Sequence, residues 1–205
     1  ADERRRHVRI RNPLTEEQAV LRTTMVYSLL LNAKRNADCG GFDLKIFEVG
    51  RTFIGRGEGE LPLEANRMAC LITGLRYEDR SHSRDLRADF YDLKGCVENI
   101  LDVLRIPSSS FGSGIHETFL HPGKSCGVFS GEVRIGFLGE VHSAVLARMD
   151  LTGPIVVCEL DMDRVIKVAK ETGTVLEIDA LPDRLDLKDE YIKKAVEAGV
   201  KLAID

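Results

Sequence analysis

A pair of strand-like segments joined by a glycine-containing turn constrains the fold most strongly. Residues 42–54 and residues 67–75 are rich in aliphatic, aromatic and β-branched side chains, with a period near two in the first segment. Between them, residues 56–59 (RGEG) have the composition of a turn. The two segments are therefore predicted to form an antiparallel hairpin. Gly50, inside the first strand, indicates either a bulge or a close approach of another group to the backbone.

An amphipathic helix is predicted before this hairpin. Thr15 is a good capping residue, and Gln18 lies three positions later, as a capping box requires. Leu21, Met25 and Leu29 then recur at helical spacing, up to a Gly-Gly pair that ends the segment. The helix is expected to begin directly after Thr15, to pack on the sheet and also to meet a second helix.

Further elements of both kinds follow in irregular order. Asp89 is predicted to cap a second helix, which ends before Pro107. Strands are expected near residues 126–129, 133–138 and 155–160, with a short helix near residues 143–149. This irregular alternation favours an α+β domain, an antiparallel sheet flanked by helices, over a doubly wound fold.

The last part of the chain changes character near Lys170. Residues 174–178 and 200–204 have strand character, and residues 187–198 show an amphipathic helical pattern between them. This order predicts a short C-terminal β-α-β segment, the connection found between parallel strands. Two units are therefore expected, residues 1–170 and residues 171–205.

Composition excludes several classes of protein. The formal net charge of the 205 residues is −4 and 43% of them are hydrophobic, which is typical of a globular protein. No apolar run approaches the roughly 20 residues that span a bilayer, and no secretion signal is recognisable, so no membrane partner and a cytoplasmic location are expected. Five cysteines, without a C-x-x-C pair, fit a reducing compartment; they are Cys39, Cys70, Cys96, Cys126 and Cys158.

One basic cluster surrounds His7 near the N terminus, formed by Arg4, Arg5, Arg6, Arg9 and Arg11. Basic arms of this kind bind nucleic-acid phosphates, so Arg4, Arg5 and Arg6 are candidates for nucleic-acid contact. A solvated chain end is the favoured interpretation, because no aromatic side chain for base stacking is interleaved with the arginines.

Two groups of residues invite a catalytic interpretation, and neither has the required spacing. Gly123-Lys124-Ser125 has the composition of the end of a phosphate-binding loop, but Thr118 occupies the position of that motif's first glycine. Six residues are candidates for a metal site or an acid–base pair: His116, His121, His142, Glu117, Glu140 and Glu159. None of them lies at an i, i+4 spacing on a predicted helix. Structural roles are therefore favoured, with no catalytic residues and no metal ligands.

Seven sequence blocks occur together in a specific order. They are RNPLTEEQAVLRTTMVYSLL (11–30), KIFEVGRTF (45–53), ITGL (72–75), DFYDLKGCVENIL (89–101), HPGKSCGV (121–128), IGFLGEVH (135–142) and VCELDMDRV (157–165). Over about residues 8–168 the chain resembles the β subunit of bacterial phenylalanyl-tRNA synthetase. The match lies in the part of that subunit whose core is similar to a class II aminoacyl-tRNA synthetase that has lost catalysis.

The resemblance implies an antiparallel sheet flanked by helices, which docks on the catalytic α subunit in an α2β2 assembly. The helix carrying Leu21, Met25 and Leu29 is implied to contact that subunit. Active class II enzymes carry an ATP-binding arginine and glutamate where this chain has residues 47–50 (FEVG), and a second ATP-binding arginine is absent around residues 153–163. No cofactor is therefore expected in this chain, and ATP, magnesium and tRNA are implied only for the holoenzyme.

The tail, residues 174–205, is instead similar to the end of the polymerase-and-histidinol-phosphatase (PHP) domain of family X DNA polymerases. In that family the segment is a β-α-β unit with Asn in place of Asp179, followed by a metal-binding aspartate-x-histidine pair. The expectation is a chimaera whose tail has a different origin from its core. A PHP-type metal-dependent phosphoesterase fragment is thus an alternative function, and a tRNA-contacting module is a third.

Overall fold

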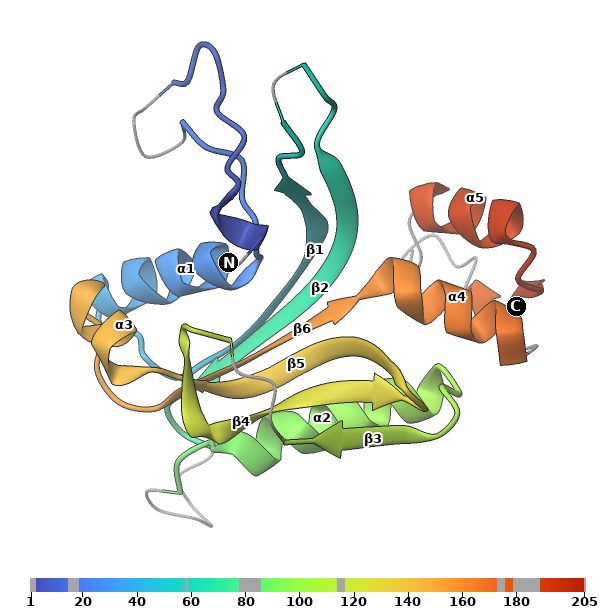
Figure 1. The fold of residues 1–205 in the computed structure, drawn as a ribbon. Coiled ribbons are helices and arrows are strands. Elements are labelled where there is room, and N and C mark those ends of the chain that lie inside the picture. Colours follow the sequence, from blue (N-terminus) through green and yellow to red (C-terminus); the bar gives the residue numbers. More distant parts are fainter. Residues whose placement is uncertain are drawn as a thin grey trace.

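A six-stranded antiparallel sheet in the order β1-β2-β6-β5-β4-β3 forms the centre of the computed structural model (Figure 1). The structure describes residues 3–14, 19–57, 59–77, 86–113, 117–172, 176–178 and 189–204. The strands of this sheet are β1 (Leu44–Ile54), β2 (Leu63–Thr73), β3 (Ser109–Gly112), β4 (Leu120–Ser130), β5 (Val133–Val141) and β6 (Ile155–Asp161). The α+β class predicted from the irregular order of elements is confirmed.

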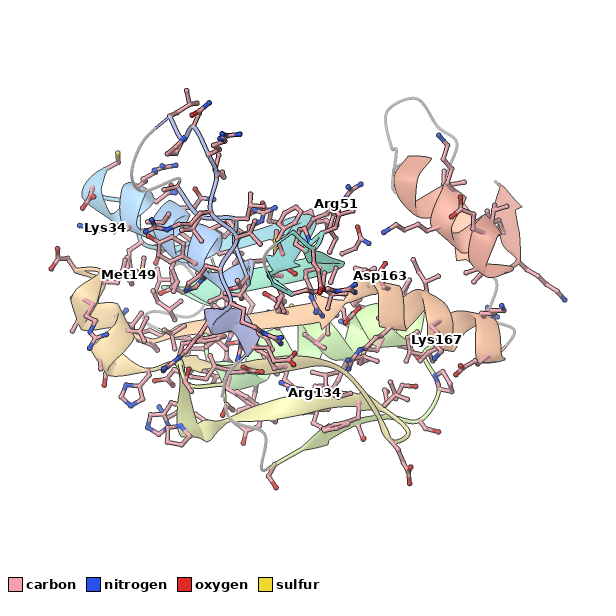
Figure 2. All side chains as sticks on the ribbon, turned by 45° about the horizontal axis from the view of Figure 1, so that its top comes forward. Lys34, Arg51, Arg134, Met149, Asp163 and Lys167 are labelled. Carbon is pink, nitrogen blue, oxygen red and sulfur yellow. The ribbon has the colours of Figure 1, made fainter. Side chains whose placement is uncertain are left out.

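Helices cover both faces of the sheet. The elements are η1 (Glu3–Arg5), α1 (Val26–Asp38), α2 (Phe90–Val103), α3 (Ser143–Arg148), α4 (Met162–Thr172) and α5 (Asp189–Ala198). One buried cluster joins α1 and α3 to the sheet, and a second cluster joins α2 and α4 to the opposite face. Lys34 of α1 and Met149, directly after α3, lie at one end of the molecule, whereas Asp163 and Lys167 of α4 lie at the other (Figure 2). No helix among the described residues is long and apolar enough to cross a membrane.

The predicted β1–β2 hairpin is confirmed. Its register runs without interruption from the Leu44–Thr73 pair to the Ile54–Leu63 pair, so Gly50 does not mark a bulge. Gly50 instead allows a close approach: a Cβ at this position would lie 3.1 Å from the Cε atom of Met25 and would overlap the guanidinium of Arg22. The glycine is therefore required because Arg22 and Met25 pack against it, and not because the strand bends or bulges there.

The predicted cap of α2 is also confirmed. The Asp89 carboxylate accepts hydrogen bonds from the backbone N–H groups of Tyr91 and Asp92, at 2.8 and 3.2 Å. The Asp92 carboxylate accepts in return from the backbone N–H of Asp89, at 2.8 Å, which completes a capping box. Leu93, Val97 and Leu101 then face the sheet as buried residues.

The first helix begins later than its sequence pattern predicts. Thr15 and Gln18, the predicted capping residues, lie outside the described residues, and α1 begins only at Val26. Leu21 precedes the helix in an extended segment, where its N–H donates to the carbonyl of Val8 at 2.9 Å. The prediction of a helix at residues 19–24 was wrong, because backbone pairing with the extended segment around residues 8–10 overrides the local helical period.

The predicted interface stripe lies mostly inside the molecule. Met25 and Leu29 are 0% and 1% exposed and belong to the same buried cluster as Leu71 of β2. A partner that packs on α1 would therefore meet the other side of the helix, because these two side chains are already covered by the chain's own sheet. This corrects the expectation that Leu21, Met25 and Leu29 form one contact surface on the helix.

The C-terminal segment forms the predicted parallel unit, in which β7 (Leu176–Ile178) pairs with β8 (Leu202–Ile204). Helix α4, which the sequence pattern did not predict, links this unit to β6 and crosses the expected boundary at residue 170. Ile166 of α4 shares a buried cluster with Ala195 of α5 and with Val200. The tail is therefore packed on the core through α4.

Candidate functional site

A cavity of about 260 Å³ lies on the sheet between β2, β5, β6 and the N-terminal segment. We call it the arginine–carboxylate cavity. Four arginines and four acids line it, so that its formal charges cancel: Arg4, Arg67, Arg134 and Arg164 face Glu3, Glu117, Glu159 and Asp161. Isoleucine and phenylalanine side chains supply the remaining walls.

Glu159 is one of three buried acids of the cavity, with 6% of its surface exposed. Its Oε2 atom accepts hydrogen bonds from the hydroxyl of Thr24 at 2.7 Å and from the backbone N–H of Met25 at 2.8 Å. Burial raises the pKa of Glu159, while these hydrogen bonds and the charges of Arg67 and Arg4 oppose the rise. The carboxylate of Glu159 on β6 thus helps to cap the start of α1, where the N-cap residue Met25 supplies no side-chain hydrogen bond and the hydroxyl of Thr24 accepts from the N–H of Val26 at 3.2 Å.

Arg67 links β2 to β6 beneath the cavity. Its guanidinium pairs with Asp161 at 2.7 Å and lies 3.9 Å from the nearest oxygen of Glu159. The Nε atom of Arg67 is buried without a hydrogen-bond partner. Asp161 also pairs with Arg164 at 3.3 Å and accepts from the backbone N–H of that residue at 3.0 Å, which caps the start of α4.

Glu117, which precedes β4 and is 5% exposed, joins the N-terminal segment to the wall of the cavity. Arg134 of β5 pairs with this carboxylate at 2.5 Å, and Arg4 of η1 pairs with its other oxygen. Arg4 also lies over the ring of Phe119, with 5.2 Å between the guanidinium carbon and the ring centroid. Arg4 is therefore committed to an internal contact, which argues against its predicted role in nucleic-acid binding.

The other two predicted nucleic-acid residues have different surroundings. Arg5 is exposed, and Arg6 is exposed and pairs with Glu3 at 2.8 Å. A surface pair of this kind contributes little to stability and does not prevent a further contact. A nucleic-acid contact through Arg5 and Arg6 stays a prediction.

The side chain of Arg22, from the segment before α1, lies against β1 near residues 47–50, where the resemblance implies the ATP-binding residues of active class II enzymes. Its guanidinium donates to the carboxylate of Glu48 at 2.6 Å and to the carbonyl oxygen of Arg51 at 2.9 Å. The missing side chain of Gly50 leaves the space that the guanidinium fills. At this position β1 therefore carries Glu48, whose charge is neutralised by Arg22 of the same chain.

We expect Gly50→Ala to lower the free energy of unfolding by about 1–2 kcal/mol. The new methyl group would displace the Arg22 guanidinium and break its contact with Glu48. Chemical denaturation of the wild type and the variant measures the effect. In an Arg22→Ala background the same substitution should be nearly neutral, because the group that it displaces is gone. An equal loss in both backgrounds would show that Arg22 is not the reason for the glycine.

The remaining candidate residues have structural roles. His121 and His142 stack with ring centroids 6.3 Å apart, and their Nδ1 atoms accept from the backbone N–H groups of Gly123 and Ala144, each at 3.1 Å. The Nδ1 atoms of both rings are therefore engaged in local backbone hydrogen bonds, which a metal bound at Nδ1 would have to displace. Among the residues that the structure describes, no cluster of histidine, cysteine and acidic side chains could hold a metal ion. His116 lies outside the described residues.

Lys124 of the rejected phosphate-loop sequence lies on β4, where it pairs with Glu140 of β5 at 2.7 Å. Phosphate-binding loops require a helix directly after the lysine. Residues 123–125 lie within strand β4, which confirms that no helix follows Lys124. Glu140 is thereby also accounted for as part of a cross-strand ion pair.

The fold is similar to that of a known enzyme class. Desulfitobacterium hafniense PylSc, a pyrrolysyl tRNA synthetase, superposes with a TM-score of 0.57 at 14% sequence identity, over 78% of this chain and 53% of that chain. A second structure of pyrrolysyl-tRNA synthetase from the same organism gives 0.54 at 14% identity, over 74% and 50% of the two chains. The sheet and its helices therefore have the fold of a class II aminoacyl-tRNA synthetase core.

Sequence relatives define the family within this fold. The family model of the phenylalanyl tRNA synthetase beta chain CLM domain matches residues 1–162. The phenylalanine–tRNA ligase beta subunit of Syntrophus aciditrophicus is 44% identical over 203 residues, which is 99% of this chain and 25% of the relative. That of Geobacter sulfurreducens is 40% identical, over 89% and 23% of the two chains. The chain belongs to the phenylalanyl-tRNA synthetase β chain family, and it spans about a quarter of the length of these curated relatives.

The same alignments correct the expected origin of the tail. With 203 of the 205 residues aligned to one β subunit, both the core and the C-terminal β-α-β segment match a single relative. The similarity to a PHP domain is therefore not supported, and neither is a chimaera. A short β-α-β pattern is common to many unrelated folds, which is why this resemblance misled. The alternative of a phosphoesterase fragment rested on that tail alone, so it is no longer supported.

Proposed function

We propose that this chain is a non-catalytic assembly domain of phenylalanine–tRNA ligase, which supports Phe-tRNA formation through a catalytic α subunit. The neutralised charge of the arginine–carboxylate cavity carries this proposal. Adenylate formation requires cationic groups that are free to stabilise the phosphates of ATP. The arginines here pair with Glu117 and Asp161, and Arg22 pairs with Glu48 on β1. ATP, magnesium and the tRNA acceptor end would then be bound by the α subunit.

A cytoplasmic location is part of the same proposal. Cys39, Cys70, Cys96, Cys126 and Cys158 are all free thiols in the structure. Cys70 and Cys158 face each other on β2 and β6 without a disulfide bond between them. Free thiols in this number fit a reducing compartment, where protein synthesis takes place.

The outer side of α1 is the surface that this proposal assigns to the α subunit. Tyr27 is 51% exposed, and Arg35 and Asp38 are also exposed. Leu31 and Lys34 are partly exposed and complete a stripe with Tyr27 at i, i+4 and i+7 spacing. Tyrosine and arginine side chains are enriched in protein interfaces. The sheet covers the opposite stripe of the helix, which contains Met25 and Leu29.

We expect Tyr27→Asp to weaken the complex of the full-length β subunit with the α subunit by at least about tenfold. A charge in the middle of a packed helix face has no partner and must be desolvated there. Tyr91→Asp is the matched control, because Tyr91 is 75% exposed on α2, on the opposite face of the sheet. Sedimentation equilibrium of the two purified subunits measures the affinity. If both variants weaken the α–β complex equally, the outer side of α1 is not the contact surface. If the wild-type subunits do not associate, the assembly function is refuted.

A further inference from the structure

Two hairpins project side by side from one end of the sheet (Figure 1). The first is an N-terminal hairpin, in which the N–H of Ile10 donates to the carbonyl of Ala19 at 2.8 Å. It is joined to the end of β1 by hydrogen bonds from Phe53 to Arg22 and from Gly55 to Arg6, each at 2.8 Å. The second is the tip of the β1–β2 hairpin. These backbone bonds hold the two projections in a fixed relation, so the space between them is a built feature of the fold.

A groove of about 390 Å³ separates the two projections. Arg6 and Arg9 line it from the N-terminal hairpin, and Arg56 lines it from the β1–β2 hairpin. Glu60 is the one acid that lines it among the residues that the structure describes. The groove therefore has a positive charge that is only partly compensated, in contrast to the neutral arginine–carboxylate cavity.

Exposed apolar side chains lie on the same two hairpins that line this groove. Leu14 of the N-terminal hairpin is 94% exposed, and Leu61 of the β1–β2 hairpin is 86% exposed. On the same two hairpins, Ile10 is 40% exposed, Val20 39% and Leu63 44%. Leucines exposed to this extent, on two projections that also carry the arginines of the groove, have the mixed composition of a protein–protein contact. We call these two leucines and the three arginines the hairpin tip.

We propose that the hairpin tip docks the partner subunit of the proposed function, through a segment of that subunit that combines acidic side chains with apolar pockets for Leu14 and Leu61. The inference rests on the proposed assembly function and extends its interface beyond α1. The two surfaces are continuous in the chain, because the N-terminal hairpin leads directly into α1 at Val26.

A nucleic acid fits this surface less well than a protein does. Among the residues that the structure describes, no tyrosine, phenylalanine or tryptophan lines the groove to stack on a base. The two leucines would remain in water beside a phosphate backbone, whereas a protein partner would bury them.

The test uses the full-length β subunit, the α subunit, two double variants and two single-substitution controls. We expect Leu14→Asp with Leu61→Asp to weaken the α–β complex by at least about tenfold. Arg9→Glu with Arg56→Glu should slow association and abolish its dependence on salt, because rim charges act mainly on the rate of encounter. The matched controls are Val103→Asp on α2, where the valine is 79% exposed, and Lys167→Glu on α4. Both controls should leave the affinity unchanged.

The outcomes separate this inference from the proposed function. If wild-type subunits associate and the tip variants associate equally well, the tip is not a docking surface. If the tip variants instead lose binding of tRNA, the groove is a nucleic-acid site and the inference is overturned. If the tip variants lower the melting temperature of the full-length β subunit alone, the rest of that subunit covers the tip, which also overturns it. If the wild-type subunits do not associate, both proposals fail.

Discussion

Gly136→Ala is expected to lower the free energy of unfolding by about 3 kcal/mol or more. Gly136 lies on β5 opposite Leu160 of β6, in the middle of the sheet. A Cβ at this position would lie 2.7 Å from the Cδ2 atom of Leu160 and would overlap the backbone carbonyl of Glu159. Because a backbone atom cannot swing aside as a side chain does, the two strands would have to separate at the floor of the arginine–carboxylate cavity.

Gly95→Ala is the control for this prediction. Gly95 lies within α2, and a Cβ at that position would meet no atom within 4 Å. The same substitution should therefore stabilise the protein by about 0.5–1 kcal/mol, as alanine does in a helix interior. For a chain of this size, the loss expected for Gly136→Ala corresponds to a melting temperature lower by roughly 6–12 °C. A Gly136→Ala variant that melts together with the wild type would show that β5 and β6 can move apart freely.

Glu159→Ala is expected to lower the free energy of unfolding by about 2–3 kcal/mol. The substitution removes the acceptor for the hydroxyl of Thr24 and for the backbone N–H of Met25, and leaves both donors without that partner. It also removes the carboxylate that lies beside Arg67. Thermal and chemical denaturation measure the loss. Glu159→Gln retains an oxygen in the acceptor position and should lose less.

The pH dependence of these variants tests whether burial dominates the pKa of Glu159. Burial raises this pKa above the ordinary glutamate value, so the protonated carboxyl is the form that favours the folded state. Its contribution is full at a pH below the unfolded pKa, about 4.3, and is lost as the pH rises through the folded pKa. Glu159→Gln cannot ionise. Its stability relative to the wild type should therefore increase between about pH 4 and pH 7. A relative decrease over this range would mean that the arginines outweigh the burial.

Local patterns were sufficient where neighbouring residues decide the structure. The period of two in residues 42–54 and the capping sequence from Asp89 predicted β1 and α2, because backbone dihedrals and nearby caps respond to adjacent side chains. The C-terminal β-α-β order was predicted in the same way. The α+β class followed from the order of these elements.

Local patterns failed where a distant segment supplies the decisive contact. The helical spacing of Leu21, Met25 and Leu29 predicted one long helix, but Leu21 pairs with Val8. The start of α1 is set by Glu159, more than a hundred residues away in the chain. Helix α4 was missed as a separate element between β6 and the tail. Such long-range hydrogen bonds leave no periodic signal.

In the candidate site too, some features could be predicted from the sequence and others depend on contacts between distant residues. The sequence could indicate that residues 47–50 lack an arginine-x-glutamate pattern, and that Gly50 admits a neighbouring group. It could not indicate that this group is Arg22, or that Arg4 turns inward to pair with Glu117. The arginine cluster at the N terminus therefore suggested a nucleic-acid arm, although one of its members completes the wall of a cavity.

The sequence by itself determined the strands, the helix after Asp89, the family blocks and the absence of a recognisable catalytic motif, because these depend on residue types at short spacing. The tertiary structure alone decided which charges neutralise each other, which side of α1 is covered, and that two hairpins enclose a basic groove. The physical reason is that an ion pair or a buried face depends on the distance between atoms in space. Residues separated by more than a hundred positions, such as Arg4 and Glu117, come together only when the sheet forms.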